Sequence, residues 1–257
     1  MKLRELLQKL VEVQERIGAT KPYICGGTPR DKYMGRLDNI SDLDITTGDK
    51  TVDYLSQEFA INLRQTYDVT RKPMPDGHST IFIGSLKMDF SSNFNVPGID
   101  NILIKKGIIA PTDMQKEMYS RDFTCNSLLL DTSLKKITDP TGRALIDIKE
   151  KKIRTCLSPE ITLTSNRNRV VRSIYLACKL GFDLDESIVK YVQQNPDSIK
   201  ISTDKVMAEK LDEAFDKDPH KASYLLDKMG LWTFVPVSEK MYPYYERHSK
   251  GKVNVPK

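Results

Sequence analysis

Two aspartates one residue apart, Asp42 and Asp44, are the clearest chemical signal in the sequence. If residues 43–46 form a strand, both carboxylates point to the same face and can bind one cluster of divalent cations. A third carboxylate, Asp89, lies on a later predicted strand, between Met88 and Phe90. Three carboxylates with two Mg²⁺ ions can activate a hydroxyl and steady a leaving pyrophosphate in an in-line displacement at phosphorus.

A glycine pair, Gly26-Gly27, precedes the aspartates and follows a short apolar run at residues 23–25. Thr28 and Pro29 are typical of a helix N-cap and first turn, so the predicted order is strand, glycine turn and helix N-terminus. Such a turn offers backbone N–H groups to a phosphate. A glycine pair can also be a plain turn, and Asp-x-Asp can be a plain polar strand end. Their combination in one stretch favours a phosphate and metal site.

The elements that must position these residues form an α+β pattern. An amphipathic helix opens the chain, and β-type runs are predicted at residues 65–70, 80–83 and 86–90. Residues 95–115, which contain several glycines and prolines, predict an irregular loop. From about residue 144 only helical signals follow. We therefore expect a catalytic head at 1–136, with a small mixed or antiparallel sheet flanked by helices, and an all-helical neck and shortened body at 137–257.

Composition excludes several classes of protein. No run approaches the roughly 18 apolar residues of a membrane helix, and the N-terminus lacks a signal-peptide pattern, so we expect a cytoplasmic protein with no membrane partner. The four cysteines are far apart without ligand spacing, which predicts buried thiols and neither a zinc site nor disulfides. The net charge of +5 falls wholly within residues 151–257, which mildly favours a polyanionic partner there.

These motifs resemble those of the class II tRNA nucleotidyltransferases and bacterial-type poly(A) polymerases, in the superfamily that contains DNA polymerase β. The first motif, Gly26 to Asp31 followed by Asp42-Leu43-Asp44, is similar to the family's GGxxRD and DxD. Later stretches resemble three further elements in the same order: residues 121–128 resemble RRDFTxNAL, residues 139–154 resemble DPxGG…DL…IR, and residues 179–182 match the end of the helix that closes with LGF. The resemblance covers about residues 20–237.

The resemblance implies roles for individual residues. The cation ligands would be Asp42, Asp44 and Asp89, with Mg²⁺ as the cofactor. The nucleotide-binding residues would be Gly26, Gly27, Arg30, Asp31, Arg121, Asp122, Asn126, Asn166, Arg169 and Arg172. Arg30 and Asp31 could instead only cap and salt-bridge the short helix, since surface pairs contribute only about 0–1 kcal/mol. Arg121, Asp122 and Asn126 could instead join the head to the neck.

Three departures from the family pattern stand out, and the first of them bears on base selection. The base-reading EDxxR motif is Ser165-Asn166-Arg167-Asn168-Arg169 here, so the arginine is kept and both acids are lost. An asparagine donates and accepts, whereas an aspartate only accepts, so base selection could be relaxed or altered. Ser120 replaces the first arginine of RRDFT, and the chain stops well short of a full-length family member.

The function that the resemblance implies is template-independent transfer of a nucleoside monophosphate from an NTP to an RNA 3′-hydroxyl, with release of pyrophosphate. Addition or repair of the tRNA 3′ CCA end, using ATP and CTP, is the first choice. The alternatives are a small poly(A) polymerase or another terminal nucleotidyltransferase, and a catalytically silent RNA-binding homologue.

Overall fold

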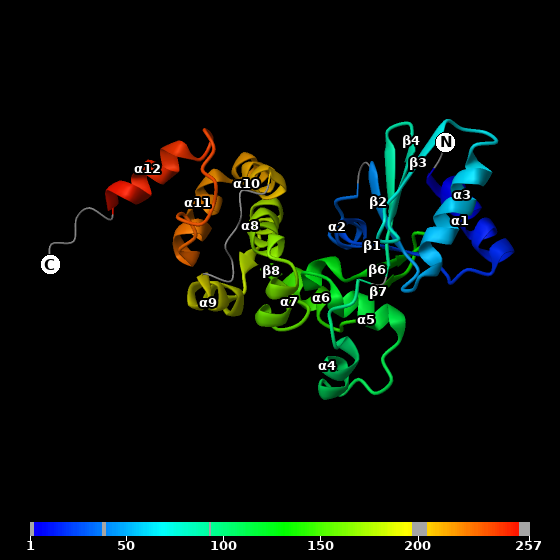
Figure 1. The fold of residues 1–257 in the computed structure, drawn as a ribbon, viewed down its shortest axis with the longest axis horizontal. Coiled ribbons are helices and arrows are strands. Elements are labelled where there is room, and N and C mark those ends of the chain that lie inside the picture. Colours follow the sequence, from blue (N-terminus) through cyan, green and yellow to red (C-terminus); the bar gives the residue numbers. More distant parts are fainter. Residues whose placement is uncertain (1–2, 38–39, 93, 197–204, 252–257) are drawn as a thin grey trace. The chain divides into compact units, whose positions relative to one another are not determined.

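The computed structural model describes residues 3–37, 40–92, 94–196 and 205–251, and the chain divides into two compact units, Met1–Ile146 and Asp147–Lys257. The sequence predicted a division near residue 136. The first unit extends to Ile146 because β7 (Ile137–Thr138) pairs with β6 (Leu129–Asp131) and so belongs to the sheet of this unit. The predicted α+β architecture, a sheet flanked by helices, is confirmed (Figure 1).

The first unit is built on one mixed sheet, which among the described residues has the strand order β3-β4-β5-β2-β1-β6-β7. Apart from β6 and β7, its strands are β1 (Tyr23–Cys25), β2 (Asp42–Thr46), β3 (Val69–Pro73), β4 (Ser79–Ile83) and β5 (Leu86–Phe90). The neighbours are antiparallel except β2 and β5, which are parallel. The central parallel pair therefore joins segments more than 40 residues apart in the sequence.

One face of this sheet is covered by α1 (Leu3–Ile17) and α3 (Thr51–Leu63), as Figure 1 shows. Strand alternation sends Leu43, Ile45, Met88 and Phe90 to that face, where each is fully buried. Both helices bring apolar side chains onto the same core, and the rings of Phe59 and Phe90 lie 6.2 Å apart. The polar residues between these core positions must point to the opposite face.

The prediction of an irregular loop at residues 95–115 is wrong. Two short helices occupy much of this stretch, α4 (Ile99–Lys105) and α5 (Asp113–Ser120). Gly98, in a left-handed conformation, precedes α4, and Thr112 with Gln115 forms a capping box at the start of α5. The glycines and prolines mark the ends of these helices, and Leu103 is buried between them and the rest of the unit.

Two local boundaries also differ from the sequence prediction. The helix after the glycine turn, α2 (Gly27–Tyr33), is capped by Gly26 with φ +73°, and Thr28 is already inside it. The Thr28 hydroxyl instead donates to the carbonyl of Asp42 at 3.4 Å, which ties α2 to β2. The strand expected at residues 65–70 begins only at Val69, because the preceding residues form the turn that ends α3.

The second unit is mainly helical. Its helices are α7 (Pro159–Ser165), α8 (Asn168–Leu180), α9 (Glu186–Gln194), α10 (Lys205–Lys217), α11 (Pro219–Met229) and α12 (Tyr242–Gly251), while α6 (Ala144–Lys149) crosses the division. A small parallel pair, β8 (Lys152–Ile153) with β9 (Asp183–Leu184), is an addition to the predicted all-helical pattern. It forms because Gly181 ends α8 with φ +70° and returns the chain to Lys151.

Helix α8 forms the centre of the second unit and packs against α10 and α11. Its buried face includes Val170, Ile174 and Ala177, which recur at helical spacing. Trp232 is 2% exposed and donates its indole N–H to Asp227 at 2.8 Å. This tryptophan is therefore a core residue and not an exposed platform for an RNA base.

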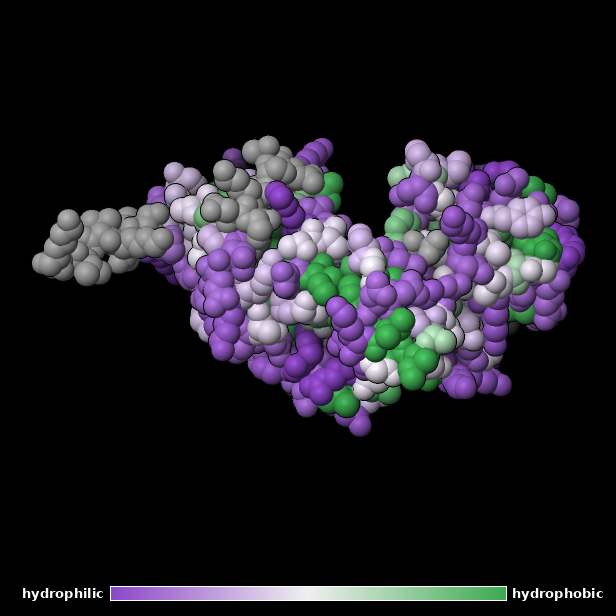
Figure 2. Space-filling view, turned by 60° about the horizontal axis from the view of Figure 1, so that its bottom comes forward, coloured by the Kyte–Doolittle hydropathy of each residue, from purple (hydrophilic) through white to green (hydrophobic). Residues whose placement is uncertain are grey.

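The visible surface is largely hydrophilic, with separate hydrophobic patches (Figure 2). Among the described residues, no helix combines the length and apolar character needed to cross a lipid bilayer. The four cysteines are buried, as predicted.

A core substitution tests the helix-covered face of the sheet. Phe59→Ala should lower the free energy of unfolding by about 3–5 kcal/mol, because it removes a fully buried ring and leaves a cavity against Phe90. Tyr54→Ala, on the same helix but 52% exposed, should change it by less than about 0.5 kcal/mol. Urea denaturation measures both, and equal losses would contradict this description of the core.

Candidate active site

The parallel register of β2 and β5 brings the predicted cation ligands side by side. Asp42 lies opposite Lys87, and Asp44 lies opposite Asp89. Since cross-strand partners share a face of a sheet, all four side chains project from the face that α1 and α3 leave free. We call Asp42, Asp44 and Asp89 the carboxylate row. The structure thus brings together three residues that are far apart in sequence.

The row continues across the sheet on both sides. Thr80 on β4 lies opposite Asp89, and its hydroxyl donates to Asp89 Oδ1 at 2.6 Å. Cys25 on β1 lies opposite Asp44, and its thiol donates to the carbonyl of Asp44 at 3.5 Å. The backbone and side chains of the row are therefore held from both neighbouring strands.

The carboxylate row concentrates negative charge at a partly buried place. Burial raises the pKa of Asp44 above its ordinary value, and the charges of Asp42 and Asp89 raise it further, while Arg121 and Lys87 oppose the rise. A divalent cation beside Asp44 would favour its ionised form and relieve this repulsion.

The donor set fits a hard divalent cation only in part. Asp42 and Asp44 supply carboxylate oxygens from one face of one strand, which suits Mg²⁺. Within residues 3–37, 40–92, 94–196 and 205–251, however, no three side chains of His, Cys, Asp or Glu are arranged as a finished metal site. The third carboxylate of the row, Asp89, forms an ion pair with the Lys87 ammonium.

Gly26 is required by the close approach of Asp44 to the glycine turn. A Cβ built at Gly26 would lie 2.1 Å from Asp44 Oδ2, and the backbone there has φ +73°. Both facts exclude an L side chain at this position. The turn and the second aspartate of the row are therefore in direct contact.

A clamp next to the glycine turn is formed by the side chains of Arg30, Asp31 and Asn126. Arg30 is 2% exposed and pairs through Nε and Nη2 with the Asp31 carboxylate at 2.8 and 3.0 Å. Its Nη1 donates to Asn126 Oδ1 at 2.6 Å. The clamp links α2 to η1 (Thr124–Asn126), a short 3-10 helix. Asp122, also mostly buried, accepts from the backbone N–H of Phe123 at 2.8 Å.

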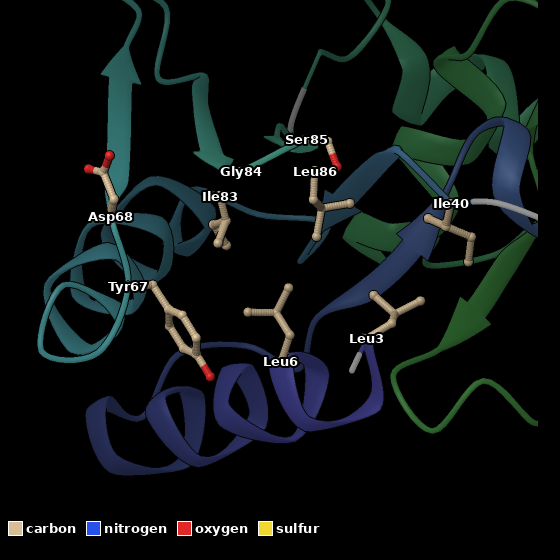
Figure 3. Close-up of a pocket in the computed structure, with 9 residues that line it drawn as sticks. All are labelled: Leu3, Leu6, Ile40, Tyr67, Asp68, Ile83, Gly84, Ser85 and Leu86. Carbon is tan, nitrogen blue, oxygen red and sulfur yellow. The ribbon is translucent and has the colours of Figure 1, made fainter. Parts of the chain in front are cut away.

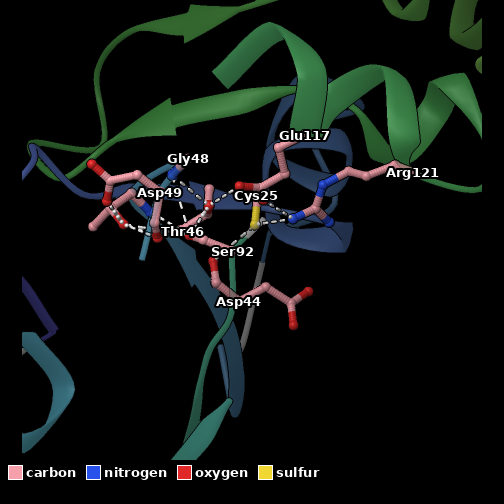
Figure 4. Close-up of polar contacts among 9 residues, drawn as sticks. Cys25, Asp44, Thr46, Gly48, Asp49, Ser92, Glu117 and Arg121 are labelled. Atoms are coloured by element: carbon pink, nitrogen blue, oxygen red, sulfur yellow. Dashed lines mark hydrogen bonds and ion pairs between the residues drawn. The ribbon is translucent and has the colours of Figure 1, made fainter. Parts of the chain in front are cut away.

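Arg121 lies beside the carboxylate row and is held by two partners (Figure 4). Its Nη2 donates to Cys25 Sγ at 2.8 Å and to Glu117 Oε1 at 3.1 Å. Burial raises the pKa of the Cys25 thiol, so this sulfur keeps its proton and accepts from the guanidinium. The Arg121 Nε is buried without a hydrogen-bond partner, and the positive charge of the guanidinium acts on Asp44.

Glu117 joins Arg121 to the end of β2. Its Oε2 accepts from the Thr46 hydroxyl at 2.6 Å, and Thr46 Oγ1 lies 2.7 Å from the hydroxyl of Ser92. Both hydroxyl oxygens accept from the backbone N–H of Gly48, as Figure 4 shows. Because Glu117 is 4% exposed and fully engaged, it fixes the position of Arg121 relative to the strand that carries Asp44.

The remaining predicted residues belong to the second unit and are described there by themselves. Asn166 ends α7, and its side-chain oxygen accepts from the backbone N–H of Asn168 at 3.0 Å. Arg169 donates through Nη1 to the carbonyl of Thr162 at 3.1 Å and to the hydroxyl of Ser165 at 2.9 Å. Arg172 follows on the same helix, α8, and is half-buried.

A cavity of about 550 Å³ lies at the N-terminal part of α1 and the turn between β4 and β5 (Figure 3). Leu3, Leu6, Ile83 and Leu86 line most of it, and among the described lining residues Asp68 alone is charged. It contains no basic side chain for a phosphate. The carboxylate row, which is open to solvent at Asp42, is therefore the better candidate site.

Sequence reasoning missed three residues of the site: Lys87, Thr80 and Glu117. Alternation along residues 86–90 places Lys87 on the same face as Asp89, so the first was detectable. Glu117 precedes Arg121 by four residues, the spacing of a helical ion pair. Thr80 was detectable too, because a two-residue turn between the runs predicted at residues 80–83 and 86–90 sets a hairpin register that pairs Thr80 with Asp89.

Curated proteins that are similar in sequence to this chain are named as tRNA nucleotidyltransferases or CCA-adding enzymes. The tRNA nucleotidyltransferase of Schizosaccharomyces pombe is 27% identical over 209 residues, which is 76% of this chain and 42% of that protein. The chain spans about half the length of the curated relatives it matches.

Solved structures agree on the fold. A tRNA-processing enzyme in an apo form superposes with a TM-score of 0.70 at 22% identity, covering 95% of this chain and 62% of that one. The CCA-adding enzyme of Bacillus stearothermophilus in complex with CTP gives a TM-score of 0.69 at 19% identity, covering 94% of this chain and 56% of that one.

A family model also matches the chain directly. The model of the poly A polymerase head domain matches residues 22–154, more than half of the 257 residues. The matched stretch contains the glycine turn, the whole carboxylate row, the Arg30 clamp and Arg121. The motif resemblance found in the sequence is thereby confirmed, and the chain belongs to the poly A polymerase head domain family.

Proposed function

We propose that this protein is a template-independent nucleotidyltransferase that adds nucleoside monophosphates from NTPs to an RNA 3′-hydroxyl, and that its acceptor is the 3′ end of a tRNA, where it adds or repairs CCA. The observation that carries this proposal is the carboxylate row in contact with the glycine turn. Family membership supports it, and so do the relatives, which are named as tRNA nucleotidyltransferases and CCA-adding enzymes and whose structures include complexes with ATP, CTP and tRNA.

In the proposed reaction the RNA 3′-hydroxyl attacks the α-phosphorus of the NTP. A new phosphodiester bond forms, the bond to the β-phosphate oxygen breaks, and pyrophosphate leaves. The hydroxyl proton passes to a carboxylate of the row or to water. Nucleotidyltransferases of this kind generally use a divalent metal, and Mg²⁺, held by Asp42 and Asp44, would polarise the phosphate and lower the pKa of the attacking hydroxyl.

Other residues of the first unit would position the nucleotide. Gly26 and Gly27 would offer backbone N–H groups of the turn to a phosphate, because neither adds a side chain of its own. Arg121 would hold the polyphosphate or sugar, because its guanidinium is fixed by Cys25 and Glu117 and its positive charge acts on Asp44. Arg30, Asp31 and Asn126, which bond mainly to one another, would act by holding the turn in place.

In the second unit we assign base contact to Asn166, Arg169 and Arg172. Arg169 is oriented by two acceptors at the end of α7, and its planar guanidinium has the shape to pair with a base edge. Asn166 both donates and accepts, so it can pair with either of two base edges. A cytoplasmic location stays a prediction from the N-terminal sequence.

One assay distinguishes this function from its alternatives. The protein is incubated with Mg²⁺ and a tRNA that lacks its terminal nucleotides, with each labelled NTP offered singly and together. Products that end after CCA support the proposal, and a growing A-tail indicates a poly(A) polymerase. No incorporation indicates a catalytically silent RNA-binding homologue. The loss of both acids at positions 165 and 166 is the observation that favours this alternative.

Replacing the first two carboxylates of the row tests whether they are needed for nucleotide transfer. The double variant Asp42→Asn, Asp44→Asn should lower transfer by at least about 10²–10³-fold, because the charges that hold the cation are lost while the strand is kept. The control Asp76→Asn removes an exposed carboxylate between β3 and β4 and should transfer at the wild-type rate. Undiminished transfer by the double variant would refute the mechanism.

Alanine substitution at two glycines distinguishes the effect of backbone strain from the effect of contact with Asp44. Gly26→Ala and Gly35→Ala both force alanine into φ near +70°, which costs about 1 kcal/mol of stability or more, and the loss should be larger at Gly26, where ψ is −131°. Only at Gly26 would the methyl strike Asp44, since nothing lies within 4 Å of a Cβ at Gly35. Transfer should therefore fall about tenfold or more in Gly26→Ala and remain near wild type in Gly35→Ala, both measured below their melting temperatures. Equal activities would show that the contact is unimportant.

The base-reading assignment is tested by another matched pair. Arg169→Ala should raise KM for CTP and ATP by about tenfold, since a charge-assisted pair contributes about 1.5–3 kcal/mol. Arg167→Ala removes an exposed arginine two residues away and controls for net charge. Steady-state kinetics with single NTPs measure both variants. Equal changes in KM would assign the effect to general electrostatics and not to base pairing.

A further inference from the structure

Lys87 supplies a positive charge inside the carboxylate row. Its place is set by the sheet, because β5 runs parallel to β2 and Lys87 lies opposite Asp42 while Asp89 lies opposite Asp44. The Lys87 ammonium forms an ion pair with Asp89 Oδ2, and its Nζ lies 3.7 Å from Asp42 Oδ1. One ammonium therefore bridges the two outer carboxylates of the row.

Both oxygens of Asp89 are already in use. Oδ1 accepts from the Thr80 hydroxyl at 2.6 Å, and Oδ2 accepts from Lys87. The side chain of Asp89 is 28% exposed, so water satisfies less of it than of a surface carboxylate. A divalent cation that approaches Asp89 therefore meets the ammonium of Lys87 at Oδ2, and the two positive charges repel each other there.

A plain surface ion pair is the simpler alternative, and such pairs contribute little. Three features distinguish Lys87. It contacts two carboxylates and not one, both acceptors belong to the set that would bind the cation, and Thr80 holds Asp89 in the orientation that the ammonium needs. The side chain of Lys87 is 41% exposed, so it can swing out to solvent without disturbing the sheet.

We propose that Lys87 is a resident cation that occupies the carboxylate row in the free protein and competes with the divalent cation for Asp42 and Asp89. This inference rests on the proposed function of the row. Lys87 is then a positioning residue: it keeps three like charges together in the absence of metal and sets the metal concentration at which the row is filled. Asp44, which does not contact Lys87 directly, is the carboxylate through which metal first binds.

Binding of Mn²⁺ to the free, full chain tests the proposal without reference to activity. Isothermal titration calorimetry, or the electron paramagnetic resonance signal of unbound Mn²⁺, gives Kd for the wild type, Lys87→Gln and Lys87→Arg. Lys87→Gln should bind Mn²⁺ about three- to tenfold more tightly, because a competing unit charge is removed. Lys87→Arg keeps the charge and should remain within about twofold of wild type.

Two controls make the result decisive. Lys50→Gln, at an exposed lysine before α3, removes the same charge away from the row and should leave Kd unchanged. Circular dichroism confirms that each variant is folded. Unchanged or weaker Mn²⁺ binding in folded Lys87→Gln would overturn the role of Lys87.

The same titration separates this inference from the proposed function. The double variant Asp42→Asn, Asp44→Asn should lose Mn²⁺ binding if the row is the cation site. Equal binding by wild type and the double variant would overturn the proposed site itself. Wild-type binding that depends on the aspartates but not on Lys87 would overturn only the competition.

Discussion

The parallel pairing of β2 with β5 is the constraint on which the rest of the first unit depends. It places four apolar side chains, Leu43, Ile45, Met88 and Phe90, against α1 and α3. The same register places Asp42, Asp44, Lys87 and Asp89 on the opposite face. A slip of one residue would exchange the two faces and bury the charges, so the core enforces the geometry of the site.

The carboxylates of the row repel one another, and two positively charged side chains beside them offset that repulsion. Arg121 acts on Asp44 from one side of the row, held by Glu117 and Cys25. Lys87 acts at the other side on Asp42 and Asp89. The two cations differ in freedom: the Arg121 side chain is 20% exposed and tied through Glu117 to the end of β2, whereas Lys87 is 41% exposed and joined only to carboxylates. The fixed cation suits a polyphosphate, and the free one suits exchange with a metal ion.

Local signals in the sequence predicted the parts of the site that lie within one stretch. The Gly26-Gly27 turn, the Asp42 and Asp44 pair and the amphipathic first helix follow from spacing alone. The order of the strands and the contact of Gly26 with Asp44 do not, because they depend on pairing between segments that are not adjacent in the sequence. The helices within residues 95–115 were missed because glycine and proline at helix ends were taken as signs of a continuous loop. The alternation that places Asp89 on the uncovered face of the sheet places Lys87 there as well, because the two residues are two positions apart on one strand.

The division of the chain into two units gives a physical reason why base selection can change while the chemistry is kept. The carboxylate row belongs entirely to the first unit, and the altered residues, Ser165 and Asn166, belong to the second. The Asn166 side chain accepts from the N–H of Asn168, which a carboxylate could do equally well, and the Ser165 hydroxyl accepts from Arg169, where a glutamate would form an ion pair. The loss of both acids therefore preserves the turn between α7 and α8 and changes only the charge beside Arg169. In the proposed function, substitution at these two positions would alter the charge beside the residues that contact the base, while the backbone turn that carries them is kept.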